Sequence, residues 1–257
     1  MTPPLPEPLI RSPIAHRALH DVADGRPENS RAAIRAAIAA GFAIEIDLQL
    51  SRDDQAMVFH DYDLKRLTDE VGAIRLRDAA ELQQIALKGG AGETIPTLEE
   101  VLELVAGRSP MLIELKDQDG SMGPNTGGML EAATVAALKD YQGPVAVMSF
   151  NPNMVAKLAR LAPDLPRGLV TLSYDPDGLP LSRETCDRLR EIPDFDRVGA
   201  SFISHEVSDL TRPRVLELRR AGVPVLCWTV RSPLVDTEAR RNADNVTFEG
   251  YLAAIPA

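Results

Sequence analysis

The sequence predicts an α/β protein, a (β/α)8 TIM barrel with a small insertion after its second strand. Short apolar or alternating runs recur between amphipathic stretches of helical periodicity, an alternation typical of parallel α/β folds. The chain has 257 residues, a common length for such barrels. No internal repeat or linker divides it, so we expect residues 1–257 to form a single domain in which 61–96 is the insertion.

Eight strands and seven helices are expected in alternation. The expected strands are Pro13–Arg17, Ala43–Leu50, Met111–Lys116, Val145–Phe150, Gly168–Leu172, Ser201–His205, Pro224–Val230 and Asn245–Glu249. The expected helices are Ser30–Ala40, Leu98–Val105, Met129–Leu138, Met154–Leu161, Ser182–Arg190, Arg214–Ala221 and Pro233–Asn242. Capping signals support several helix starts, at Ser30, at Thr97-Leu98-Glu99-Glu100 and at Asn151-Pro152. Gly41, Gly107 and Gly222 follow expected helix ends.

The second strand is expected to continue into a hairpin. Residues 43–61 read AIEIDLQLSRDDQAMVFHD, and the turn at 51–54 is too short for a parallel crossover. Gln55–His60 should therefore fold back antiparallel to Ala43–Leu50. With a four-residue loop, Leu50 faces Gln55 and His60 lies opposite Glu45, on the same face. The hairpin is thus predicted to bring His60 to the acids of the strand.

Composition narrows the function classes. The net charge is −10 with acids and bases mixed along the chain, which argues against a nucleic-acid surface, so an anionic substrate would need a local positive site. No apolar run reaches the roughly 18 residues of a membrane span. The start, MTPPLPEPLIRSP, lacks signal-peptide features and is expected to be a short extended lead-in. Cys186 and Cys227 have no metal-like spacing and are expected to be buried thiols in a reducing cytoplasm. The oligomeric state is left open.

Three acids are expected to converge at one rim of the barrel. Glu45 and Asp47 should point inward from the second strand, and Glu114 and Lys116 share a face near the C-terminal end of the third. Buried carboxylates that converge are costly unless a cation neutralises them. Ligands that are all oxygen favour one hard divalent cation, Mg²⁺ or Ca²⁺, over zinc. The alternative is that each acid pairs with a base, Arg17 or Lys116.

Two of the four histidines are expected to join this site. Imidazole titrates near neutral pH, so His16 and His60 suit a reaction that needs one base and one acid. His20 and His205 are expected to be non-catalytic. Arg17 and Lys116 suit an anion beside the cation, and a phosphodiester fits this set. One histidine would activate the attacking oxygen while the other protonates the leaving alkoxide.

Several motifs together resemble the glycerophosphodiester phosphodiesterase family. In order, they are Ile14-Ala15-His16-Arg17, Pro27-Glu28-Asn29-Ser30, Glu45-Ile46-Asp47, Val58-Phe59-His60-Asp61, Ile95-Pro96-Thr97-Leu98-Glu99-Glu100 and Ile113-Glu114-Leu115-Lys116. The resemblance is strong over 13–117 and continues weakly through Ser149-Phe150 and Cys227-Trp228-Thr229-Val230. It implies a (β/α)8 barrel with an insertion after the second strand.

The resemblance also implies roles for residues of this chain. Glu45, Asp47 and Glu114 would bind the metal, His16 and His60 would be the acid–base pair, and Arg17 and Lys116 would contact the phosphate. The small-molecule substrates would be glycerophosphodiesters of lipid metabolism, cleaved to glycerol 3-phosphate and an alcohol. Attack by a substrate hydroxyl, giving a cyclic phosphate, and direct attack by water both stay open. Phe150 and Trp228 would line the glycerol pocket, or else pack the barrel.

The chain departs from the family pattern at two places. Ala18 stands where the family usually has glycine, and Phe248-Glu249 stands where the last strand usually ends in Thr-Asp. One alternative function is therefore a catalytically inert phosphate-ligand binding barrel. The other is a lysophospholipase D-like hydrolase, which would need an apolar groove. The insertion offers Leu64, Leu67, Val71, Ile74 and Leu76 for such a groove, although packing onto the barrel is the favoured interpretation of these residues.

Overall fold

The computed structural model describes residues 2–256, and it confirms the barrel. Eight parallel strands follow the order β1-β9-β8-β7-β6-β5-β4-β2, and pairing of β1 with β2 closes the sheet. The strands are β1 (Ile14–Ala15), β2 (Ala43–Leu50), β4 (Met111–Leu115), β5 (Val145–Ser149), β6 (Arg167–Thr171), β7 (Phe202–Glu206), β8 (Val225–Val230) and β9 (Asn245–Phe248). Each matches a predicted strand, with ends that differ by two residues at most.

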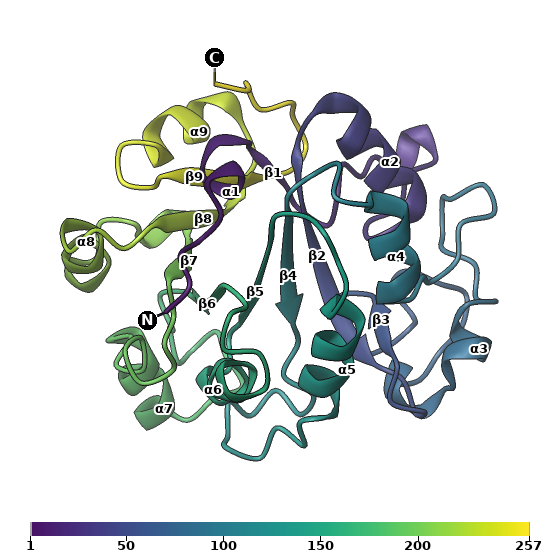
Figure 1. The fold of residues 1–257 in the computed structure, drawn as a ribbon, viewed down its shortest axis with the longest axis horizontal. Helices are drawn as coiled ribbons and strands as arrows, with labels where there is room; N and C mark the ends of the chain where they lie inside the picture. The colour runs from purple at the N-terminus through teal and green to yellow at the C-terminus, as the bar shows by residue number, and fades with distance from the viewer. Residues whose placement is uncertain (1, 257) are drawn as a thin grey trace.

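The helices lie around the sheet (Figure 1). They are α2 (Arg31–Ala40), α4 (Leu98–Val105), α5 (Met129–Leu138), α6 (Pro152–Leu161), α7 (Arg183–Arg190), α8 (Pro213–Arg220) and α9 (Pro233–Ala239). The predicted caps are present. The Ser30 hydroxyl accepts from the Ala33 N–H, Thr97 and Glu100 form a capping box, and the Asn151 side chain accepts from the Asn153 N–H.

The prediction of an extended lead-in is wrong, because residues Glu7–Arg11 form a short helix, α1. Leu5 and Leu9 are buried and pack with apolar side chains inside the barrel, among them Ile14 and Leu226. The side-chain amide of Asn245, the first residue of β9, donates to the carbonyls of Leu9 and Ser12. Helix α1 therefore covers the N-terminal end of the barrel. A helix of five residues gives too short a periodic pattern to recognise in the sequence.

The hairpin forms, but its predicted register is wrong by one residue. Strand β3 (Ala56–Val58) pairs antiparallel with β2, with Leu50 opposite Ala56 rather than Gln55. The extra residue is held in the turn, where the Ser51 N–H donates to the Gln55 carbonyl and the Gln55 N–H donates to the Ser51 hydroxyl. His60 is not paired opposite Glu45, since β3 ends at Val58. It reaches the site beyond the strand end, where the Gln49 side chain donates to its carbonyl.

The insertion, residues 61–96, forms a small unit beside β3 (Figure 1) that contains the 3-10 turn η2 (Ile74–Leu76) and helix α3 (Ala79–Leu82). Its buried side chains, with Leu64 and Ile74 at its centre, pack on Met57 and Phe59. Val71 and Leu76 are exposed. The favoured interpretation of packing is therefore correct for Leu64 and Ile74 and wrong for Val71 and Leu76.

The alternation in β2 sorts side chains between two environments. Ile44 and Ile46 pack with α2 residues such as Ile34 in the layer between sheet and helices. Burial of such aliphatic side chains contributes about 1.5–3 kcal/mol each to folding. The residues between them, Glu45 and Asp47, face the barrel interior, as expected from the strand period of two. Within residues 2–256, none of the helices is both long and apolar enough to cross a membrane.

Candidate active site

Three buried carboxylates meet on neighbouring strands. Asp47 of β2 lies directly beside Glu114 of β4 in the parallel register, and Glu45 lies one side-chain repeat earlier on β2. One oxygen from each acid lies within 4.8 Å of the others. All three residues are at most 6% exposed. The sequence prediction that these acids converge is thus correct in geometry.

Positive groups compensate only part of this charge. The Lys116 ammonium lies 2.7 Å from Asp47 Oδ1 and 2.5 Å from Glu114 Oε1, while Glu45 accepts a 2.7 Å hydrogen bond from the Arg17 backbone N–H. Burial, together with the charges of Asp47 and Glu114, raises the pKa of Glu45 well above its usual value. Burial likewise raises the pKa of Glu114. At Asp47 burial acts in the same direction, but Lys116, His60 and Arg17 together lower the pKa of this acid.

The donor set fits a hard divalent cation. Every atom that the three acids offer is a carboxylate oxygen, the ligand type of Mg²⁺ and Ca²⁺. Burial is the largest cause of the raised pKa of Glu45 and of Glu114, so a negative charge on either acid is costly in this setting. A bound cation would relieve this cost. The predicted alternative, pairing with Lys116, is also present for Asp47 and Glu114 but leaves Glu45 without a cationic side chain in hydrogen-bond contact.

His16 is held by the last strand of the barrel. Its Nδ1 lies 2.5 Å from Glu249 Oε2, and the other oxygen of Glu249 accepts from Arg231 Nε at 2.7 Å. The pairing follows from barrel closure, because the His16 backbone N–H donates to the Phe248 carbonyl across β1 and β9. The hydrogen bond with His16, aided by the nearby His20 and Arg231, lowers the pKa of Glu249. Glu249 thus stands as a carboxylate behind His16.

His60 is held in the same manner by its neighbour in sequence. Its Nδ1 lies 2.7 Å from Asp61 Oδ1, and Asp61 in turn accepts from Arg66. Arg66 also donates two hydrogen bonds to Glu28, and Glu28 accepts from Arg17 at 2.8 Å. Glu28 thus braces this part of the rim through a chain of ion pairs. This chain links the His60 imidazole to the Arg17 guanidinium.

Both imidazoles share the environment of the acid cluster. Burial lowers the pKa of His16, and burial with the charge of Lys116 lowers the pKa of His60 to about 4. The charge of Asp47 acts on both histidines in the opposite direction. Neutral imidazoles at neutral pH can accept a proton, so both are suited to acid–base chemistry.

A cavity of about 470 Å³ opens beside the acids, and its lining includes His60, Glu114, Lys116, Met122 and Phe150. Phe150 therefore lines this space, as the resemblance implied. Trp228 packs edge to face on Phe150, with ring centroids 5.5 Å apart, and its indole N–H donates to the Ser204 carbonyl. Trp228 therefore packs on a residue of the pocket wall.

The remaining histidines and cysteines differ in setting. His205 is fully buried and bonded to Thr171 and Asp209, which agrees with a structural role. His20, in contrast, lies beside Glu249, with His20 Nε2 3.6 Å from Glu249 Oε2. Cys186 and Cys227 are buried free thiols.

Two supporting residues carried weak sequence signals. Asn29, in a left-handed backbone conformation, donates from its side-chain amide to Asp47 Oδ2 at 2.9 Å. Ala18 also adopts a left-handed conformation, with φ 64°, and its N–H donates to the Glu45 carbonyl. Glycine takes this conformation without steric cost, whereas alanine pays about 1 kcal/mol, which explains the glycine usual in the family.

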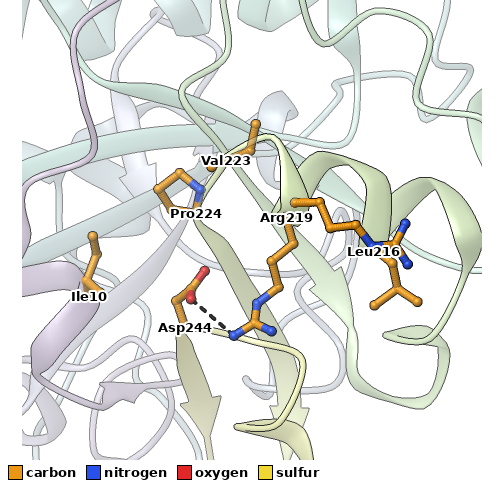
Figure 2. Close-up of a pocket in the computed structure, with 8 residues that line it drawn as sticks. Ile10, Leu216, Arg219, Val223, Pro224 and Asp244 are labelled. Atoms are coloured by element: carbon orange, nitrogen blue, oxygen red, sulfur yellow. Dashed lines mark ion pairs between the residues drawn. The ribbon is translucent and has the colours of Figure 1, made fainter.

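A larger cavity, of about 530 Å³, lies at the opposite end of the barrel (Figure 2). Pro224 and Asp244, which precede β8 and β9, line it together with Arg219. Arg219 pairs with Asp244 at 3.5 Å, and Asp244 also accepts from the Val225 N–H. The lining contains no histidine or cysteine, so it offers no acid–base pair. Active sites of such barrels lie at the C-terminal face.

The C-terminal rim brings acids, imidazoles and cationic side chains together, a set that suits a hydrolase of phosphoric diesters. The model of the glycerophosphoryl diester phosphodiesterase family matches residues 16–248. The match runs from His16, directly after β1, to Phe248 at the end of β9. The chain therefore belongs to this family, as its motifs indicated.

Individual proteins that resemble this chain carry names of the same kind. YhdW of Bacillus subtilis, named a putative glycerophosphodiester phosphodiesterase, is 29% identical over 227 residues, 85% of this chain and 86% of that protein. A glycerophosphodiester phosphodiesterase of Caldanaerobacter subterraneus is 33% identical over 153 residues, 56% of this chain and 61% of its own. Among solved structures, an Oleispira antarctica phosphodiesterase in complex with its product sn-glycerol-3-phosphate superposes with a TM-score of 0.75 at 26% identity, covering 92% of this chain and 91% of that one.

Proposed function

We propose that this chain hydrolyses glycerophosphodiesters to glycerol 3-phosphate and an alcohol, with His16 and His60 as the acid–base pair and Glu45, Asp47 and Glu114 as ligands of one Mg²⁺ or Ca²⁺ ion. One observation carries the proposal. Nδ1 of His16 is hydrogen-bonded to Glu249, and Nδ1 of His60 is hydrogen-bonded to Asp61. The negative charge of Asp47, in the acid cluster, acts to raise the pKa of both histidines. Two oriented bases beside one acidic cluster suit the displacement of an alkoxide from phosphorus.

The proton transfers take place at the Nε2 atoms. With Nδ1 engaged by Glu249, the free lone pair of His16 is on Nε2, and the same holds for His60 and Asp61. One histidine accepts the proton of the attacking hydroxyl, from water or from the glycerol moiety. The other, after protonation, donates to the leaving alkoxide. The paired carboxylate stabilises the imidazolium that forms during each transfer.

Cationic side chains of the chain hold the phosphate. Lys116 and Arg17 lie at the acids, with Arg17 Nε 3.6 Å from Asp47. Their donors are available to the non-bridging oxygens of a phosphodiester, where charge increases in the transition state. When bound, the divalent ion would supply further charge neutralisation at these oxygens. Phe150 offers an apolar wall to the carbon atoms of the glycerol moiety.

A water-soluble diester is the favoured substrate. The relative from Oleispira antarctica was solved with sn-glycerol-3-phosphate as product, and the proposed cleavage would release the same molecule here. The groove required for a lysophospholipid lacks its central residues, because Leu64 and Ile74 are buried in the insertion.

A substrate panel tests the proposal. Purified protein with Mg²⁺ or Ca²⁺ is incubated with glycerophosphocholine, glycerophosphoethanolamine and lysophosphatidylcholine, and the released choline or ethanolamine is measured together with glycerol 3-phosphate. We expect product from the first two and none from the acylated diester. His16→Ala and His60→Ala should each reduce turnover by about 10³-fold, the scale on which general acid–base groups act, with unchanged circular dichroism. Absence of hydrolysis with every diester and ion would favour the inert binding barrel instead.

A further inference from the structure

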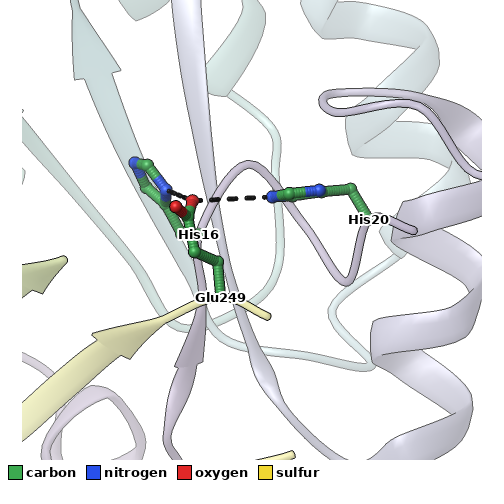
Figure 3. Close-up of side chains that lie close together, drawn as sticks. All are labelled: His16, His20 and Glu249. Carbon is green, nitrogen blue, oxygen red and sulfur yellow. Dashed lines mark hydrogen bonds and ion pairs between the residues drawn. The ribbon is translucent and has the colours of Figure 1, made fainter. Parts of the chain in front are cut away.

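Glu249 joins two imidazoles outside the acid cluster. Its Oε2 lies 2.5 Å from Nδ1 of His16 and 3.6 Å from Nε2 of His20, and the two rings lie on opposite sides of the carboxylate (Figure 3). One ligand atom from each of the three side chains lies within 4.8 Å of the others. Nε2 of His20 is buried and has no hydrogen-bond partner in the structure. This nitrogen therefore faces the carboxylate without bonding to it.

We propose that His16, His20 and Glu249 form a second metal site, which binds Zn²⁺ and holds the enzyme inactive. Two imidazoles and one carboxylate are a set of three protein ligands that zinc takes in proteins, with a water in the fourth position. The acid cluster of Glu45, Asp47 and Glu114 offers only oxygens and favours hard ions. The two clusters thus differ in ligand chemistry, so the two ions would distribute between them.

The ligand separations are compatible with a zinc site, since all three ligand atoms lie within 4.8 Å of one another. Bonds of about 2.0–2.1 Å in a tetrahedral arrangement place ligand atoms roughly 3.3 Å apart. The separations of Glu249 Oε2 from the two histidine nitrogens, 2.5 and 3.6 Å, lie on either side of that value. Arg231 holds the other oxygen of Glu249 at 2.7 Å, which orients the carboxylate as an outer-shell partner does at zinc sites.

The site has an entry path. A cavity of about 460 Å³ borders it, and its lining includes His20, Glu249, Arg26 and Tyr251. The space is large enough for an ion with its water ligand. The His20 side chain is 24% exposed and the Glu249 side chain 19% exposed, so solvent reaches both side chains, although the Nε2 atom of His20 is itself buried. Zinc can therefore enter without opening of the barrel.

The proposed inhibition follows from zinc binding to Nδ1 of His16. This inference of inhibition rests on the proposed function. Zinc on Nδ1 of a neutral imidazole places the ring proton on Nε2. That nitrogen then has no lone pair to accept a further proton, so His16 is lost to acid–base catalysis. Binding also takes the Glu249 carboxylate away from His16. His20 has no role in the proposed catalysis, which makes it the residue that separates zinc binding from turnover.

Direct binding measurements test the site without activity. Zinc is titrated against a chromogenic chelator in the presence of millimolar Mg²⁺, with wild type, His20→Gln and Val22→Ala. Val22 lies on the same loop and its side chain is exposed, so it serves as the matched control. We expect one zinc ion per chain in wild type and in Val22→Ala, and at least about 10-fold weaker binding in His20→Gln, since one of three ligands is lost. Co²⁺ should give a visible absorption band that His20→Gln lacks.

Activity completes the test. Zinc should inhibit glycerophosphodiester hydrolysis by wild type, and His20→Gln should keep its basal rate within about 3-fold while requiring at least about 10-fold more zinc for inhibition. Equal zinc affinity in wild type and His20→Gln would overturn the site, as would a loss of zinc binding in Glu114→Gln alone, which would place the ion in the acid cluster. Zinc binding through His20 in a protein that hydrolyses no diester would instead overturn the proposed function while the site stands.

Discussion

Oε2 of Glu249 lies 2.5 Å from Nδ1 of His16, although the two residues are 233 positions apart in the chain. Closure of the barrel brings them together, because β1 and β9 are neighbours. His60 has an equivalent partner in Asp61. Both imidazoles thus have a carboxylate that fixes the tautomer and the orientation of the ring. The account of catalysis depends on these two pairs.

The Glu249–His16 pair can be tested with Glu249→Gln. The amide keeps the shape but removes the charge, so kcat should fall by about 10–100-fold with little change in KM, as for loss of outer-shell partners. Glu249 works to raise the pKa of His16. Its loss should therefore shift the limb of the pH–rate profile that belongs to His16 toward lower pH. Glu249→Asp, which keeps the charge, should retain more activity, and a kcat within 2-fold of wild type in Glu249→Gln would contradict the pairing.

His60 should make stability depend on pH. Its pKa is lowered to about 4 in the fold, chiefly by burial, against about 6.5 in the unfolded chain. Between these values the unfolded state binds more protons, so the free energy of unfolding rises with pH from 4 to 6.5 and is lost as the pH falls. Partial exposure of the ring limits the effect to about 2 kcal/mol.

Urea unfolding at pH 4.5, 5.5 and 6.5 measures this dependence. His60→Gln should show a smaller rise in the free energy of unfolding over this range than wild type. Burial also lowers the pKa values of His16 and His205, so part of the rise should persist in the variant. Parallel curves for wild type and variant would show that His60 does not titrate in this manner.

The acid cluster should be unstable without a cation. Glu45→Gln removes one of three buried negative charges while its amide oxygen can still accept the hydrogen bond from the Arg17 N–H. In chelator the variant should unfold with a free energy about 1 kcal/mol higher than wild type. In wild type, an ion at 100 times its Kd should add about 2.7 kcal/mol.

Thermal unfolding with and without Mg²⁺ or Ca²⁺ provides the measurement. The ion should raise the Tm of wild type and of Glu103→Gln, an exposed position on α4, but scarcely that of Glu45→Gln. An equal rise in all three proteins would mean that the ion binds elsewhere.

Substrate binding should depend on the planar guanidinium group of Arg17. Its guanidinium donates to Glu28 at 2.8 Å and lies 3.6 Å from Asp47, a position that Lys cannot reproduce with several donors at once. Arg17→Lys should lower kcat/KM by about 10–100-fold, mainly through KM, because charge is kept but bidentate contact with a phosphate is lost. Arg26→Lys, on the same loop and paired with Asp24, is the matched control and should match wild type. Similar steady-state kinetics for both variants would remove Arg17 from the substrate contacts.

Local patterns predicted most of the fold. The strict alternation of β2 assigned Ile44 and Ile46 to the helix layer and Glu45 and Asp47 to the interior, because side chains in a strand alternate between faces. The register of the hairpin was wrong because one extra residue is taken up in a turn held by the Ser51 hydroxyl. Hydropathy did not reveal the shift, because both faces of Ala56–Val58 are buried. Helix α1 was missed because its formation depends on burial of Leu9 against distant strands.

The convergence of the candidate site residues could be predicted where they share a strand, a pair of neighbouring strands or a hairpin. His60 and Asp61 are adjacent in sequence, and the acids share a strand or neighbouring strands. Glu249 and His20 were not assigned roles, because their relation to His16 depends on barrel closure and on the path of a loop. The nearest sequence signal is that His16 and Glu249 follow the first and last strands, which adjoin in any closed barrel.

Release of glycerol 3-phosphate from glycerophosphocholine, before and after removal of divalent ions, tests the central claim most directly. Protein dialysed against chelator should release none, and addition of Mg²⁺ or Ca²⁺ should restore release in wild type but, at the same ion concentration, not in Glu114→Gln. Undiminished release in chelator, or restoration in Glu114→Gln at the wild-type ion requirement, would contradict the assignment of the buried acids to a catalytic cation.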